Sequence, residues 1–190
     1  MTSLAPPVST TVPAQRRRTR ATLLTAAAVA AGCALADLLA PPSSGSHLST
    51  AADYAYTALL FPFVLAMIAV VTMLHRMQDG NDGRAGKTGY IVASVALAAF
   101  IPCGIDSLAT GNAQALGPVY ILAILGSFAG LILFAIGSFR ARVLPRWAAP
   151  LLPLAWLLGG PLATASFRGA TLILAAAYTA IALTLPHPQS

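Results

Sequence analysis

Ionisable side chains at the ends of apolar runs are the first candidates for chemistry in this chain. The stretch AAFIPCGIDSLATG, residues 98–111, closes an apolar run with Asp106, and Asp37 closes an earlier run. A carboxylate close to hydrocarbon is costly and marks a functional site by default. Both aspartates lie near expected helix C-termini, where the helix dipole disfavours negative charge. Arg168 begins the last apolar run, where positive charge is likewise disfavoured.

Three interpretations of Asp37, Asp106 and Arg168 stay open. They form an outer-rim polar cluster in which Arg168 pairs with one carboxylate and ties the last helix to the third or the first. Alternatively, the two carboxylates line an outward-facing vestibule that binds a cation or a proton. In the third interpretation, all three side chains are simply hydrated. Asp53 is easier to explain, because Thr50-x-x-Asp53 is a capping-box pattern at a helix start.

A phosphate-loop pattern in NDGRAGKTG, residues 81–89, is incomplete. The pattern GxxxxGK[ST] needs a glycine where Asn81 stands, and it needs a preceding strand where an apolar helix is expected. We therefore expect a flexible loop that caps the following helix. The amides of that helix N-terminus, together with Lys87, are a candidate contact for an anionic lipid headgroup.

The remaining reactive residue types do not form a catalytic or metal-binding pattern. Cys33 and Cys103 lie in separate apolar runs, and His47, His75 and His187 are far apart along the chain. Neither a disulfide nor a metal site is indicated, and no nucleophile is paired with a base. The sequence therefore predicts a protein that is not an enzyme and that carries no cofactor or metal.

The composition defines the setting for these residues. The chain is 57% hydrophobic and 8% charged, whereas a soluble domain carries about 25% charged residues. Such a chain cannot cover a water-facing surface, so the lipid bilayer is its first expected partner. The net charge of +6 fits basic residues retained on the cytoplasmic side of a membrane better than binding to nucleic acid.

The predicted fold is an all-α integral membrane bundle of six transmembrane helices without a soluble domain. A basic, disordered cytoplasmic tail over 1–20 precedes the transmembrane domain, 21–185, and a short tail, 186–190, follows it. Each apolar run is near the roughly 20 residues that cross hydrocarbon. The predicted helices are at about 21–40, 54–75, 89–108, 117–139, 148–166 and 169–185. The last run is short, so an interfacial sixth helix with an external C-terminus is an alternative.

The distribution of basic residues predicts the orientation. With the N-terminus in the cytoplasm, ten of the eleven lysines and arginines are inside and only Arg168 is outside. Both termini are then cytoplasmic, in a multi-pass protein of the bacterial inner membrane. The turn after the fourth helix is topogenic, with its inner residues being Arg140, Arg142, Arg146 and Trp147. An alternative treats the first helix as a cleaved signal with the site Ala34-Leu35-Ala36, which would leave five helices.

Small residues and prolines predict how the helices pack. Gly126-x-x-x-Gly130, and the stripe of Ala28, Gly32 and Ala36, allow close approach of helix backbones. We expect both patterns to pack inside the bundle rather than between copies. The fifth helix is interrupted by prolines, and its Gly-Gly-Pro break is a weak indication of transport, although kinked packing without a ligand is the commoner explanation.

Residues 133–160, LFAIGSFRARVLPRWAAPLLPLAWLLGG, resemble a segment of uncharacterised small polytopic membrane proteins of actinobacteria, in which an R-x-R-x-L-P-R-W turn joins two apolar helices. The resemblance covers about a sixth of the chain and implies a bacterial inner-membrane protein without transferring any active-site residue. We expect a non-enzymatic accessory or partner-binding protein, whose partner is another protein or a second copy. The alternative is a small transporter or channel, and a membrane enzyme acting on lipid is the least supported class.

Overall fold

The computed structural model is helical along most of the chain and describes residues 11–43, 47–113, 116–142, 144–161 and 167–185. The helices are α1 (Thr11–Leu39), α2 (Ala51–Met77), α3 (Gly83–Ala98), α4 (Phe100–Thr110), α5 (Gly117–Ala141), α6 (Ala148–Gly159) and α8 (Thr171–Thr184). Within the described ranges, no strand forms, and the one extended pairing is an isolated bridge between His47 and Asn112. The all-α fold class predicted from the sequence is confirmed.

Four helical segments are long and apolar enough to cross a membrane. They are Ala14–Leu39, Ala51–Met77, Gly83–Thr110 and Gly117–Ala141, and the described residues also form two shorter apolar helices, α6 and α8. At 1.5 Å per residue, the 12 residues of α6 and the 14 of α8 extend about 18 and 21 Å, less than the roughly 30 Å of a hydrocarbon core. The predicted fifth helix is therefore shorter than expected, since α6 ends at Gly159 and residues 162–166 lie outside the described part.

The first helix also differs from the prediction. α1 begins at Thr11, so residues 11–20 extend the first membrane helix by turns that carry four arginines, where a disordered tail is expected. Thr19, at the end of this stretch, is fully buried, and its hydroxyl donates to the Gln15 carbonyl at 3.0 Å. Burial of Thr19 against the bundle is a tertiary effect that the polar composition of the tail does not reveal.

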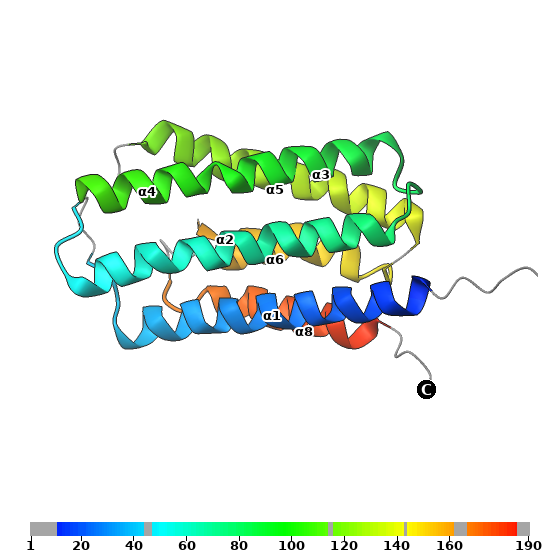
Figure 1. Cartoon of the computed structure of the whole chain (residues 1–190), viewed down its shortest axis with the longest axis horizontal. Helices are drawn as coiled ribbons and strands as arrows, with labels where there is room; N and C mark the ends of the chain where they lie inside the picture. The colour runs from blue at the N-terminus through cyan, green and yellow to red at the C-terminus, as the bar shows by residue number, and fades with distance from the viewer. Residues whose placement is uncertain (1–10, 44–46, 114–115, 143, 162–166, 186–190) are drawn as a thin grey trace, which may run out of the picture.

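Figure 1 shows two layers of helices, with α1, α2 and α3–α4 in front and α8, α6 and α5 behind. The closest packed pairs include α3 with α5 and α1 with α8. Within the front layer, α2 contacts α1 on one side and α3 on the other. Both ends of the described helical chain lie at the same end of the bundle, where α2 also ends and α3 begins (Figure 1). This end, with the basic residues of α1, α2, α3, α5 and the α5–α6 turn, is called the basic end below.

Proline and glycine explain the shape of the third span. Pro102 cannot donate a backbone hydrogen bond to residue 98, and the helix is interrupted at Ala99, between α3 and α4. The span ends at Gly111, which adopts the left-handed conformation at φ 67° and donates its amide to the Ser107 carbonyl. Glycine is suited to this helix-terminating position because it lacks a Cβ.

The α3–α5 pair owes its closeness to glycines on both helices. A Cβ on Gly130 would lie 2.4 Å from the Ala93 backbone nitrogen, and a Cβ on Gly89 would lie 2.2 Å from that of Phe134. Likewise, a Cβ added to Gly137 would lie 2.3 Å from the Cα of Gly86. The prediction that the Gly126-x-x-x-Gly130 pattern packs inside the bundle is confirmed for α5. Its physical basis is direct backbone contact, which any side chain would prevent.

The small-residue stripe of α1 behaves differently. Ala28 and Gly32 are exposed, and nothing lies within 4 Å of a Cβ added to Gly32. α1 packs on α2 and α8 through its other side, which buries Leu23, Ala26 and Ala30. The expectation that this stripe packs inside the bundle is therefore wrong for Ala28 and Gly32, because the bundle buries a different side of α1.

Candidate functional site

The three residues of the predicted outer-rim cluster are only partly brought together. Asp37 is buried near the end of α1, and its carboxylate accepts the backbone N–H of Gly169 at 2.6 Å. Arg168, beside that glycine, is exposed, and across the described residues it forms no ion pair with Asp37 or Asp106. The end of α1 and the start of α8 are therefore joined, but through a backbone amide instead of a guanidinium.

Asp106 lies apart from this contact, on α4. Its side chain is half-buried, and one carboxylate oxygen has no hydrogen-bond partner among the described residues. Asp106 does not appear among the residues that line the nearby cavities. Neither Asp37 nor Asp106 therefore lines these cavities, as a carboxylate vestibule would require.

Asp53 is held as the sequence predicts. The Thr50 hydroxyl accepts the Asp53 amide at 3.2 Å, and the Asp53 carboxylate accepts the Thr50 amide at 2.8 Å, which completes the capping box. The same carboxylate also accepts the amides of Ser43 at 2.6 Å and Ser49 at 2.8 Å. One buried carboxylate therefore fastens the α1–α2 connection onto the start of α2, which is a structural role.

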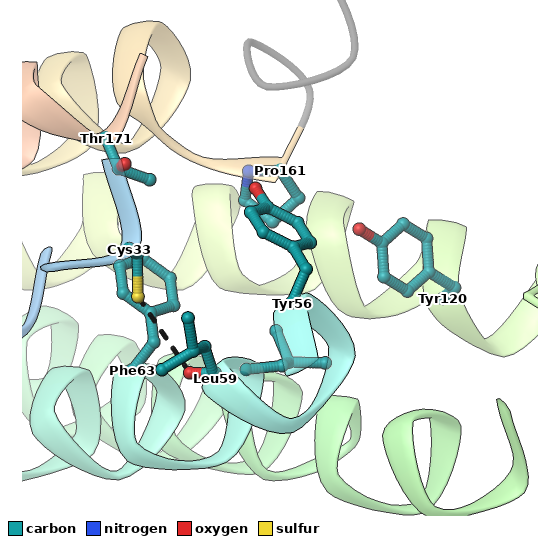
Figure 2. Close-up of a pocket in the computed structure, with 8 residues that line it drawn as sticks. Cys33, Tyr56, Leu59, Phe63, Tyr120, Pro161 and Thr171 are labelled. Carbon is teal, nitrogen blue, oxygen red and sulfur yellow. Dashed lines mark hydrogen bonds between the residues drawn. The ribbon is translucent and has the colours of Figure 1, made fainter. Parts of the chain in front are cut away.

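Two adjoining cavities lie between the helices at the end opposite the basic one. The smaller has a volume of about 70 Å³, and Figure 2 shows Cys33, Tyr56, Tyr120 and Thr171 around it. The larger, about 220 Å³, shares Tyr56 and Tyr120 with it. The described residues that line both are aliphatic, aromatic, hydroxyl or thiol side chains and glycine, with no carboxylate and no basic group. Such a lining suits an uncharged molecule and does not attract a cation.

Large aromatic side chains pack in the core beside these cavities, and Phe63 and Tyr120 belong to the lining of the smaller one. Phe63 of α2 stacks on Trp156 of α6 with ring centroids 6.2 Å apart, and Phe100 contacts Trp156 edge-on at 6.1 Å. Phe100 also meets Tyr120 of α5 edge-on at 5.2 Å. Phe63, Phe100, Tyr120 and Trp156, which we call the aromatic layer, join four helices across the core. Three of these four side chains are almost fully buried.

A polar cluster at the basic end was not predicted from the sequence. His75 Nδ1 lies 2.9 Å from a carboxylate oxygen of Asp82, and the His75 ring stacks on Tyr90 at 4.3 Å. Gln78 is buried, and its amide nitrogen donates to the hydroxyl of Ser138 on α5. The sequence contains one local signal, since His75 and Asp82 flank a single turn. The pairing of Gln78 with a residue sixty positions away has no local signature.

The early start of α3 changes the interpretation of Lys87. α3 begins at Gly83, six residues earlier than predicted, because the chain leaves α2 through a tight turn with Asp79 and Gly80 at positive φ. Lys87 is therefore exposed in the second turn of α3, away from the free amides at the helix start. Lys87 therefore does not lie beside the free amides of the α3 N-terminus, as the predicted lipid-headgroup contact requires.

The α5–α6 turn places its basic residues around the end of α5. Arg142 adopts the left-handed conformation at φ 54° and ends the helix. Arg140, Arg146 and Trp147 are exposed, as expected for residues that meet a membrane surface. Arg140 and Arg146 both line a groove between α5 and α6, with a volume of about 410 Å³.

Comparison with known proteins gives no identity for this architecture. No protein-family model matches the chain, and neither a curated protein nor a solved structure matches it. In the part of the chain that the structure describes, no three His, Cys, Asp or Glu side chains come together in a way that could hold a metal ion.

Proposed function

We propose that this chain is a non-enzymatic integral membrane protein that acts by binding the transmembrane helix of a partner. The observation that carries the proposal is the open small-residue face of α1. The exposed residues of this face are Ala21, Thr25, Ala28 and Gly32. No other helix of the described bundle covers them. Small residues in such a row let a second helix approach closely and make many van der Waals contacts.

The flanks of this face fit the same role. Leu24 is 40% exposed and Leu35 is 56% exposed, so larger side chains border the small-residue row. A partner helix would contact the backbone of α1 at Gly32 and the side chains of the two leucines. Such packing is similar to that between α3 and α5 inside the bundle.

Crosslinking at the α1 face tests the proposal. A photoreactive residue in place of Thr25 is expected to give a discrete protein adduct in intact membranes, and Ala28→Leu is expected to abolish that adduct by filling the row. The matched control is Ala129→Leu on α5, which is also exposed and should leave the adduct unchanged. Crosslinks to lipid alone, or an adduct that survives Ala28→Leu, would refute partner binding at this face.

The alternative function is a small transporter or channel with an outward-facing carboxylate vestibule. The two cavities opposite the basic end favour it, since they adjoin and share Tyr56 and Tyr120. Two features argue against it, because no carboxylate lines the described walls and the aromatic layer packs across the core beside the cavities. Ion flux into proteoliposomes that is lost in Asp106→Asn would favour the transporter over the partner-binding protein.

We further propose that the basic end faces the cytoplasm in a bacterial inner membrane. The support is the collection of basic helix ends on one side of the bundle (Figure 1) together with the positive-inside rule. The resemblance of residues 133–160 to uncharacterised small polytopic proteins of actinobacteria is consistent with this placement.

A further inference from the structure

The groove between α5 and α6 is apolar along its length and open to the surroundings of the bundle. Its α5 wall is formed by Ile132, Ile136 and Phe139, and its α6 wall includes Pro150 and Pro153. Ile136 is 43% exposed and Phe139 is 52% exposed, so these side chains do not close the groove. The volume of about 410 Å³ falls within the roughly 300–1,000 Å³ typical of ligand pockets.

The shape of the groove follows from the residues of α6. Ala149 and the two prolines present short side chains toward α5, so the helices leave space that Ile136 and Phe139 do not fill. In a membrane protein such a space faces hydrocarbon, and an acyl chain is the molecule with the matching chemistry.

The groove has a charged end as well as an apolar floor. Arg140 comes from the last turn of α5, and Arg146 comes from the turn before α6, yet both line the same groove. Neither guanidinium forms an ion pair with a carboxylate of the described chain. Two unpaired arginines at one rim recognise a phosphate through charge-assisted hydrogen bonds.

The start of α6 adds to this positive potential. α6 begins at Ala148 without a side-chain cap, and Ala149, the next residue, lines the groove. A helix N-terminus carries a partial positive charge and favours a nearby anion. Trp147, 48% exposed beside the arginines, is of the residue type that lies at the level of lipid headgroups.

We propose that the α5–α6 groove is a binding site for an anionic phospholipid. The acyl chain lies along Ile132, Ile136 and Phe139, and the phosphate lies between Arg140 and Arg146. This site is independent of the α1 face proposed for a partner helix, because it uses different helices.

Lipid binding to the purified full-length chain tests the site. Native mass spectrometry with phosphatidylglycerol and phosphatidylcholine of the same acyl chains is expected to show preferential retention of phosphatidylglycerol. Arg140→Gln combined with Arg146→Gln is expected to weaken phosphatidylglycerol binding about 30-fold, at roughly 1 kcal/mol for each basic residue. Arg142→Gln is the matched control, since this arginine belongs to the same turn but does not line the groove.

A competition experiment on the unmodified protein tests the site without any variant, so poor folding of a variant does not affect it. Glycerol phosphate and inorganic phosphate, which lack acyl chains, are expected not to displace phosphatidylglycerol from the unmodified protein. Equal retention of the two phospholipids, displacement by glycerol phosphate, or an equal loss in Arg142→Gln would each overturn the proposal. The last outcome would mean that the basic turn attracts anions without a built site.

Discussion

Buried carboxylates at the end opposite the basic one are stabilised by backbone amides. Asp53 accepts three of them, and Asp37 accepts one. An amide fixed by the fold offers a hydrogen bond at no cost in side-chain entropy, whereas an arginine would have to be ordered first. This difference explains why Arg168 stays exposed while Gly169 next to it makes the contact.

Asp37→Ala is expected to lower the free energy of unfolding by about 1–3 kcal/mol, because the buried Gly169 amide would lose its acceptor. Asp37→Asn retains a carbonyl acceptor and should cost less. Arg168→Gln should change stability by no more than about 0.5 kcal/mol. Unfolding in mixed micelles measures all three, and a coupling above about 0.5 kcal/mol between Asp37→Asn and Arg168→Gln would restore the ion-pair interpretation.

Asp53→Asn is expected to lower the Tm by about 3–6 °C, because the amide that replaces one carboxylate oxygen cannot accept the N–H bonds now made there. The control is Asp79→Asn, at an exposed turn position with positive φ that asparagine tolerates. Thermal unfolding of the purified protein compares the two. Equal Tm values for Asp53→Asn and the unmodified protein would show that the capping network does not stabilise the fold.

The helices show what sequence patterns determine and what they leave open. Apolar length places α2 and α5 within three residues of their predicted limits, and the Thr50–Asp53 capping box is correct in detail. The start of α1, the early end of α6 and the aromatic layer depend on contacts between distant segments. A pattern of small residues likewise states that a helix can approach another closely, but not which face the bundle will use.

Gly130→Ala is expected to destabilise the bundle by about 1–3 kcal/mol or more, because its Cβ would overlap the Ala93 backbone, which cannot move away as a side chain can. The matched control is Gly32→Ala, in open space on α1. That variant should be neutral or stabilising by up to about 1 kcal/mol through its better helix propensity. Unfolding free energies of the two variants are compared in the same micelles, and an equal loss would contradict the proposed α3–α5 backbone contact.

At the scale of the whole molecule, the bundle is electrically one-sided. Ten of the eleven lysines and arginines belong to helix ends or turns at the basic end, and Arg168 belongs to the opposite end. The sequence alone predicts this asymmetry from the positions of the apolar runs. The structure adds that the charged end is also where the polar cluster of His75 and Asp82 and the arginine-lined groove occur, whereas the buried carboxylates Asp37 and Asp53 belong to the opposite end.

Accessibility to a membrane-impermeant maleimide checks this one-sided arrangement in cells. A cysteine in place of Asn81, in the exposed turn between α2 and α3, is expected to react only after the membrane is permeabilised. A cysteine in place of His47, which is exposed at the opposite end, should react in intact cells. Cys33 and Cys103 are buried and provide little background.

The opposite labelling pattern would place the basic end outside the cell and invert the proposed orientation. Labelling of both positions in intact cells would be incompatible with a bundle that crosses the membrane between them. Either result would also remove the cytoplasmic leaflet as the source of the phospholipid in the α5–α6 groove, because α5 ends at the same end of the bundle as α2 (Figure 1). The orientation of the bundle therefore decides which lipids the groove can meet.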